Sequence, residues 1–194
     1  MYKGKKKYVI QTIAIALAYI ILTIIADQFG MAKGIVQIRI SDALMVLPYF
    51  TPAAIPGLFI GCLASNGIIS YVQDPMTGKM ILSSAAQYYI IFGSIATLCG
   101  AIGGYLLRKY KFVVSVPAII FNTIAVPLIF KFAFRYEDSL LKCILTVGVG
   151  ELISCGLLGT ALLLGLEDSK DKIFPSDKVD DTADEEKQAE EKNE

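Results

Sequence analysis

The stretch QIRISDALMVLPYFTPAAIPG, residues 37–57, decides how the chain can fold, because it places two charged residues and three prolines in an apolar run. Pro48, Pro52 and Pro56 each lack an amide hydrogen and clash with the preceding turn, so one regular helix cannot pass through them. We therefore predict two helices, a short one near 41–50 and a longer one near 53–72.

The composition around this stretch is that of an integral membrane protein. Hydrophobic residues make up 55% of the 194 residues, the mean hydropathy is +0.58, and the chain has neither His nor Trp. Several runs reach the roughly 20 apolar residues that a membrane-spanning helix needs. Five apolar blocks are visible, at residues 8–29, 43–72, 81–107, 112–133 and 140–166.

The positions of the basic residues restrict the number of membrane crossings. Lysines 3, 5, 6 and 7 precede the first block, and RKYK at 108–111 joins the third block to the fourth. Basic residues close to helix ends indicate the cytoplasmic side, so an even number of crossings must separate the two sites. Splitting the second block satisfies this condition. We predict an all-α integral membrane protein of the cell membrane, a six-helix bundle with a short broken second helix and both termini cytoplasmic.

The short helix cannot cross a bilayer alone. Ten residues reach only about 15 Å, against a hydrocarbon core of about 30 Å. Part of that crossing must be irregular backbone that is shielded by protein or faces a wet cavity. Broken helices of this kind hold polar ligands in membrane transporters.

The chain divides into two parts of different composition. Residues 1–166 form the predicted transmembrane, substrate-binding domain. Residues 167–194 carry twelve acidic residues and five lysines, and contain too little apolar material to offset the entropy of ordering. We interpret 167–194 as an acidic, disordered, solubilising cytoplasmic tail.

Polar residues at membrane depth are the candidates for function. Glu151 and Asn122 lie near the middle of apolar segments, where an ionisable group costs about 3 kcal/mol and usually faces a cavity or a partner. A ligand site is favoured, although Glu151 could instead pair with Arg39. Arg39 and Asp42 directly precede the broken helix, and a local salt bridge between them is about as well supported as a ligand contact.

Aromatic and small residues complete the candidate set. The aromatic residues could sandwich a planar ring, although interfacial positions explain single tyrosines equally well; they are Tyr49, Phe50, Tyr88, Tyr89 and Phe92. Ala14 and Ala18 are spaced to let a helix approach closely, either inside the bundle or on a partner protein.

Catalytic machinery is not indicated. There is no His for acid–base chemistry, and Cys62, Cys99, Cys143 and Cys155 lack metal-ligand spacing. No nucleotide-binding loop is present, so energised transport would need another subunit or an ion gradient. We predict a protein that is not an enzyme and uses no cofactor, metal or nucleic acid.

Four segments together resemble the QueT family of membrane proteins, over residues 8–166; they are VQIRISDALMVLPYFTPAAIPGLFIGCLASN, FGSIATLCGAIGGYLLRK, PAIIFNTIAVPLIF and VGVGELISCGLLG. The resemblance implies a substrate-binding S component of an energy-coupling factor (ECF) importer that takes up queuosine precursors. It also implies a transmembrane coupling subunit and two cytoplasmic ATPases as partners, with Ala14 and Ala18 on the coupling face.

The resemblance also gives the polar residues roles. Glu151 would accept two N–H groups of a 7-deazaguanine, and Asn122 would bond the neighbouring carbonyl or ring nitrogen. Asp42 would meet a cationic aminomethyl group, and Arg39 would hold the carboxylates or bond the ligand carbonyl. Tyr89 stands where family members often carry an acid, and Asp42 where they carry a longer glutamate, so another heterocycle or a vitamin-like ring stays open.

Two other functions fit the residues. In a standalone secondary transporter, Glu151 and Asp42 would exchange protons during transport of a small heterocycle. In a small membrane scaffold, the polar residues would only bridge helices.

Overall fold

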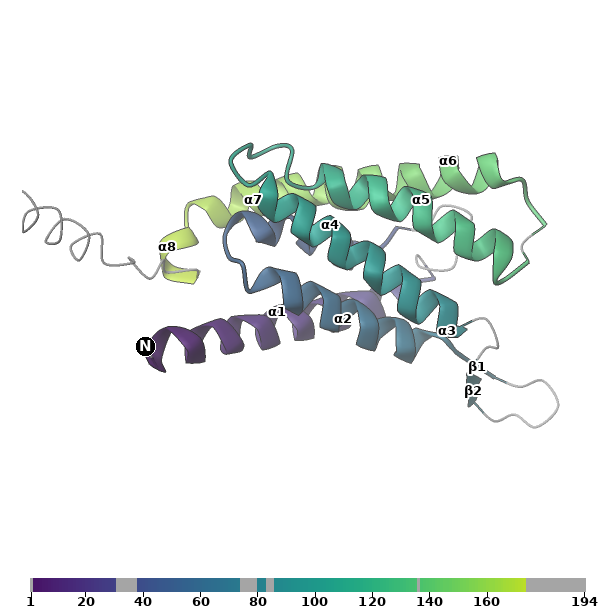
Figure 1. Cartoon of the computed structure of the whole chain (residues 1–194), viewed down its shortest axis with the longest axis horizontal. Coiled ribbons are helices and arrows are strands. Elements are labelled where there is room, and N and C mark those ends of the chain that lie inside the picture. Colours follow the sequence, from purple (N-terminus) through teal and green to yellow (C-terminus); the bar gives the residue numbers. More distant parts are fainter. Residues whose placement is uncertain (1, 31–37, 74–79, 83–85, 136, 174–194) are drawn as a thin grey trace, which may run out of the picture.

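The computed structural model describes residues 2–30, 38–73, 80–82, 86–135 and 137–173, which form an elongated helical bundle (Figure 1). Its helical elements, in chain order, are α1 (Tyr2–Gln28), the 3₁₀-helix η1 (Ile40–Tyr49), α2 (Ala54–Ile69), α3 (Ala86–Tyr88), the π-helix η2 (Tyr89–Gly93), α4 (Ser94–Leu106), α5 (Val116–Phe132), α6 (Leu140–Glu151), the π-helix η3 (Leu152–Leu158), α7 (Gly159–Glu167) and α8 (Lys170–Ile173).

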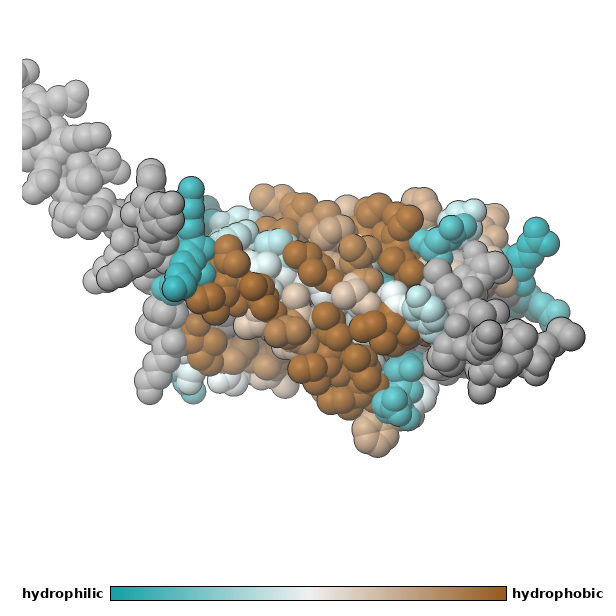
Figure 2. Space-filling model, turned by 90° about the horizontal axis from the view of Figure 1, so that it is seen from below, coloured by the Kyte–Doolittle hydropathy of each residue, from teal (hydrophilic) through white to brown (hydrophobic). Residues whose placement is uncertain are grey.

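The predicted all-α membrane fold is confirmed. Three continuous helices are long and apolar enough to cross a membrane, over Lys5–Gln28, Ala86–Leu106 and Leu140–Glu167, while η1, α2 and α5 are shorter apolar helices. Hydrophobic residues cover the middle of the surface seen in Figure 2, and hydrophilic ones gather at its two ends. This distribution suits a bundle whose long axis crosses the bilayer.

The second segment is broken at the predicted place. Pro48 lies inside η1, and Pro52 lies in the turn between η1 and α2. Pro56 falls in the first turn of α2, where its missing N–H would have no helical partner in any case. Ten residues of 3₁₀-helix rise about 20 Å, so η1 is too short to cross the hydrocarbon core alone.

A small hairpin corrects two predicted boundaries. Tyr71–Gln73 (β1) pairs antiparallel with Met80–Leu82 (β2) beyond the end of α2. The helix predicted at 53–72 therefore ends at Ile69, and the segment predicted at 81–107 becomes helical only at Ala86. The strands are three residues each, and strands this short give little periodicity to read in a sequence.

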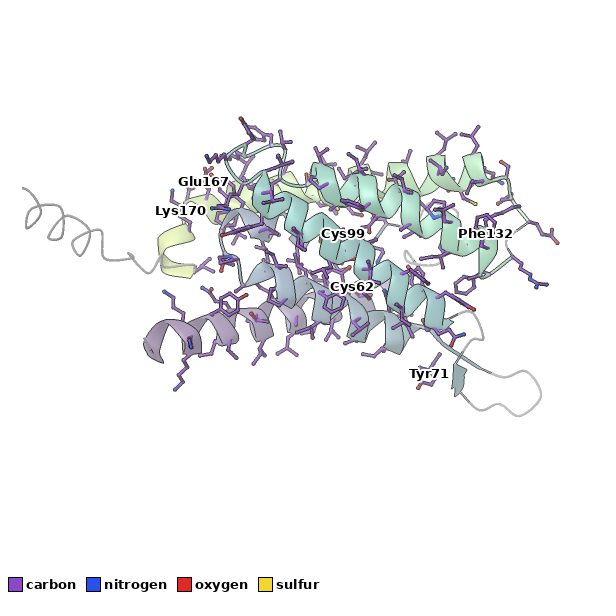
Figure 3. All side chains as sticks on the ribbon, viewed as in Figure 1. Cys62, Tyr71, Cys99, Phe132, Glu167 and Lys170 are labelled. Carbon is purple, nitrogen blue, oxygen red and sulfur yellow. The ribbon has the colours of Figure 1, made fainter. Side chains whose placement is uncertain are left out.

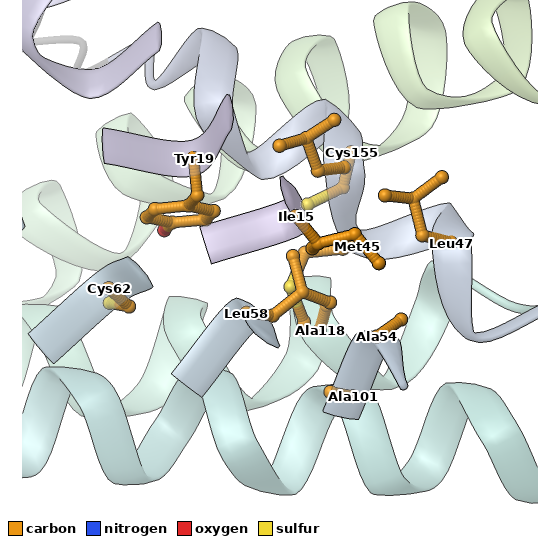
Figure 4. Close-up of a cluster of buried hydrophobic side chains, with 11 residues drawn as sticks. Ile15, Tyr19, Met45, Leu47, Ala54, Leu58, Cys62, Ala101, Ala118 and Cys155 are labelled. Atoms are coloured by element: carbon orange, nitrogen blue, oxygen red, sulfur yellow. The ribbon is translucent and has the colours of Figure 1, made fainter. Parts of the chain in front are cut away.

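Small residues bring the helices together. A Cβ added at Gly61 would stand 2.8 Å from the Tyr19 Cβ, and one added at Gly100 would stand 2.7 Å from the Ala118 Cα. These glycines let α2 approach α1 and let α4 approach α5. The core beside them combines Tyr19, Met45, Leu58 and other buried side chains from α1, η1, α2, α4, α5 and η3 (Figure 4).

Both described ends of the chain lie at one end of the bundle. The start of α1, the loop at 107–115 and α8 are together at the left of Figure 1, and Lys111 in that loop forms an ion pair with Glu167. This arrangement agrees with the six-segment interpretation. Most of the predicted acidic tail, residues 174–194, lies outside the described residues.

Candidate polar site inside the bundle

Arg39 and Asp42 form a buried ion pair at the start of η1. Arg39 Nε lies 3.7 Å from Asp42 Oδ2, one helical turn away. Asp42 is 1% exposed and Arg39 is 8% exposed. The local pairing that the spacing allowed is therefore present, and it lies inside the bundle instead of on its surface.

Side chains from three other elements hold this pair. The Tyr19 hydroxyl of α1 donates to Asp42 Oδ1 at 2.5 Å. Arg39 Nη2 donates to Asn66 Oδ1 of α2 at 2.9 Å, and Arg39 Nη1 donates to the Tyr89 hydroxyl of η2 at 3.1 Å. A planar guanidinium with several fixed donors is suited to joining groups that approach from different directions.

Glu151 is the last residue of α6 and lies near Asp42, because Cys155 contacts both residues. Glu151 is 5% exposed, and Asp42 and Arg39 are the charged residues near it. Asn122 of α5 is also buried inside the bundle, and it is 4% exposed. Cys155 Sγ lies 3.2 Å from Glu151 Oε2 and 3.3 Å from the Asp42 backbone oxygen, so its single proton can go to either.

The backbone is irregular on both sides of the site. Tyr89 begins η2 and Glu151 directly precedes η3, and both of these elements are π-helical turns. A π-turn inserts an extra residue and rotates the following side chains, and such turns occur often at functional sites. The two π-turns therefore help to set the positions of Tyr89 and of the residues that follow Glu151.

Several buried polar atoms have no hydrogen-bond partner. Among the described residues they include Arg39 Nε, Asp42 Oδ2, Ser41 Oγ and Ser154 Oγ. An unsatisfied buried polar group costs about 1–3 kcal/mol, and a charged one costs more. These atoms belong to Arg39, to η1 and to η3, and a bound polar molecule or water can satisfy them.

The predicted aromatic residues separate into three places. Tyr89 touches Arg39, and its ring stacks on Phe130 with the centroids 6.1 Å apart. Tyr49 and Phe50 meet edge to face at the end of η1 that is remote from Arg39. Tyr88 and Phe92, which are 46% and 52% exposed, stack on each other outside the polar site. The five side chains therefore do not surround one point.

Ala14 and Ala18 also differ in their surroundings. Ala14 is exposed on α1, whereas Ala18 is partly buried and packs against the core. The exposed face next to Ala14 is apolar and includes Ile10, Ile13 and Leu17.

Three further buried polar residues were not predicted from the sequence, namely Tyr19, Asn66 and Ser154. All three are at most 1% exposed. Asn66 carried the same signal as Asn122, an amide within an apolar run, and could have been found. Tyr19 and Ser154 carried none, because tyrosine and serine are common in membrane helices and only the helix crossings place them at the site.

A hollow in the described structure lies away from this site. It has a volume of about 820 Å³ and runs between α4 and α5, and Tyr88 and Phe92 line it. Arg39, Asp42, Asn122 and Glu151 do not line it.

The fold and the buried charges define a polytopic membrane protein with a polar site enclosed by its helices. Comparison with known families then identifies it more closely. The sequence matches the QueT transporter family over residues 9–168, so the chain belongs to that family and is a membrane transport protein. Searches of curated proteins and of solved structures found no match.

Proposed function

We propose that the protein is the substrate-binding S component of an ECF importer and that it captures a queuosine precursor, a 7-deazaguanine, at the outer face of the membrane. The observation that supports this most is the enclosed cluster of Arg39, Asp42, Glu151 and Asn122. A bundle that belongs to a transport family and holds two carboxylates and an arginine inside a membrane is suited to binding a polar ligand.

The charges favour a basic or donor-rich ligand. Arg39 is paired with Asp42, which leaves Glu151 as the acid without an arginine of its own in the site. A carboxylate in such surroundings gains most from two aligned N–H donors or from a cation. Glu151 therefore binds the amidine edge of the ring, and Asn122 bonds the neighbouring carbonyl or ring nitrogen.

The unsatisfied atoms supply the remaining contacts. Asp42 Oδ2 accepts from a ligand N–H or from a cationic aminomethyl group, and Arg39 Nε donates to a ligand carbonyl. Tyr89 lies next to Arg39 and supplies aromatic surface beside the ring. Tyr49, Phe50, Tyr88 and Phe92 do not contact the ring, because they lie elsewhere in the fold.

The partners follow from the transport role. The described residues contain no nucleotide-binding loop, so a coupling subunit and two cytoplasmic ATPases supply the energy. The coupling subunit docks on α1, where Ala14 and its apolar neighbours are exposed. Both termini lie in the cytoplasm, on the same side as those ATPases.

A ligand panel tests the proposal. We expect an aminomethyl 7-deazaguanine to raise the melting temperature of the purified, detergent-solubilised protein, because a ligand specific for the folded state stabilises it by mass action. Guanine and a set of vitamins serve as comparisons. If no heterocycle raises the melting temperature, the polar residues only bridge helices and the proposal is wrong.

The alternative is a standalone secondary transporter, which the two buried carboxylates also favour. Uptake into cells distinguishes the two. Uptake through an ECF importer stops when the ATPase subunits are deleted, whereas uptake through a secondary transporter survives that deletion and collapses with the proton gradient.

A further inference from the structure

The groove between α4 and α5 is lined by apolar side chains, which suit the binding of a hydrocarbon chain. It holds about 820 Å³, and the side chains that line it are almost all apolar. The six that matter here are Tyr88, Phe92, Cys99, Phe121, Phe132 and Arg135. Most are well exposed, and since the helices cross a membrane, they face the lipid.

The length of the groove matches one leaflet of a bilayer. Its α3–α4 wall runs from Tyr88 to Cys99, which is about 16 Å of helix, or about half of the hydrocarbon core. Figure 3 shows Phe132 at one end of the bundle and Cys99 near its middle. The groove therefore runs from one membrane surface to about the bilayer centre.

A cation stands at the surface end of the groove. Arg135 follows α5 in a left-handed backbone conformation, with φ of 52°, and lines the opening. The nearby carboxylate of Asp138 is engaged by Lys142 at 2.8 Å. Among the described residues no carboxylate forms an ion pair with Arg135. A guanidinium in this position is suited to a phosphate group.

We propose that this groove binds one acyl chain of an anionic membrane phospholipid, whose headgroup phosphate lies against Arg135. The apolar walls, the length of one leaflet and the cation at the surface end fit the two parts of such a lipid. The walls offer few hydrogen-bonding groups, so a transported heterocycle would bind there poorly. The inference needs only the membrane location of the protein and is independent of the proposed substrate.

The chain has no Trp, so Phe92→Trp makes a single fluorescent reporter in the groove wall. The full chain is placed in phosphatidylcholine vesicles that contain either brominated phosphatidylglycerol or brominated phosphatidylcholine at the same mole fraction. From the quenching we expect a relative binding constant about fivefold higher for phosphatidylglycerol than for phosphatidylcholine. One basic residue near an anionic surface gives a preference of about this size. Arg135→Gln should abolish the preference.

A reporter on α1 is the control. Ile21 is 55% exposed on the lipid-facing side of α1, and Ile21→Trp should be quenched equally by the two lipids. If Phe92→Trp misfolds, Phe121→Trp at the inner end of the groove makes the same measurement.

Three results would overturn the inference. They are equal quenching of the groove reporter by the two lipids, a preference that survives Arg135→Gln, and a groove reporter that neither lipid quenches. The last result would mean that a second copy of the chain or another protein covers the groove.

Discussion

Tyr19 connects the buried ion pair to α1 by a hydrogen bond between residues that are far apart in the sequence. It is fully buried and donates to Asp42 Oδ1 at 2.5 Å, which leaves Asp42 Oδ2 as the oxygen that faces Arg39 Nε. If Asp42 binds the ligand as proposed, we expect Oδ2, which has no hydrogen-bond partner, to be the oxygen that accepts from it.

Removal of the Tyr19 hydroxyl should be costly. We expect Tyr19→Phe to lower the free energy of unfolding by about 1–3 kcal/mol, because a buried carboxylate loses a donor while the ring still fills its space. Thermal or denaturant unfolding in detergent measures this. Tyr110→Phe, at a tyrosine that is 64% exposed, is the matched control and should change nothing. Equal effects of the two changes would contradict this account of Tyr19.

At the scale of elements, the sequence predicted the six segments well because bilayer length and proline chemistry constrain them strongly. Pro48, Pro52 and Pro56 decided where the second segment breaks, and the structure breaks it there. The π-turns η2 and η3 could not be predicted, because an extra residue in a helical turn leaves no clear pattern in an apolar run.

The contacts within the site were less predictable than the elements. The position of Arg39, Asp42, Asn122 and Glu151 at membrane depth could be predicted, because polar residues in apolar segments are conspicuous, and all four are buried. The contacts of Arg39 with Asn66 and Tyr89 could not be predicted. They depend on how closely α2 and η2 approach the start of η1. For the same reason the outward direction of Tyr88 and Phe92 was not foreseen.

The crossing of α1 and α2 gives a prediction at this scale. We expect Gly61→Ala to destabilise the protein by about 1–3 kcal/mol, because the added methyl group would stand 2.8 Å from the Tyr19 Cβ and 3.0 Å from the Ala16 backbone oxygen. Gly67→Ala is a matched control on the same helix, because nothing lies within 4 Å of its added Cβ. That variant should be neutral or slightly stabilising. Comparison of their unfolding midpoints tests the close approach.

The whole molecule has two ends of different composition. The loop at 107–115 carries the basic cluster and lies beside the start of α1 and α8, whereas α5 ends at Phe132 at the opposite end (Figure 1). The positive-inside rule therefore predicts that the 107–115 end faces the cytoplasm.

This orientation can be measured with a membrane-impermeant thiol reagent on intact cells. We expect Glu137→Cys to be labelled and Tyr110→Cys to be labelled only after the membrane is opened. The native background should be low, because Cys62, Cys143 and Cys155 are buried and Cys99 is partly buried within α4. The opposite pattern would reverse the topology.

Glu151 gives the most direct test of the whole account, which holds that a buried acid inside the bundle binds the transported ring. Titration of purified protein with an aminomethyl 7-deazaguanine should give a dissociation constant that rises about 30-fold in Glu151→Gln, the equivalent of about 2 kcal/mol for a lost charge-assisted pair. Glu137→Gln, in an exposed loop, should bind like the unchanged protein. An unchanged dissociation constant in a folded Glu151→Gln variant would contradict the account.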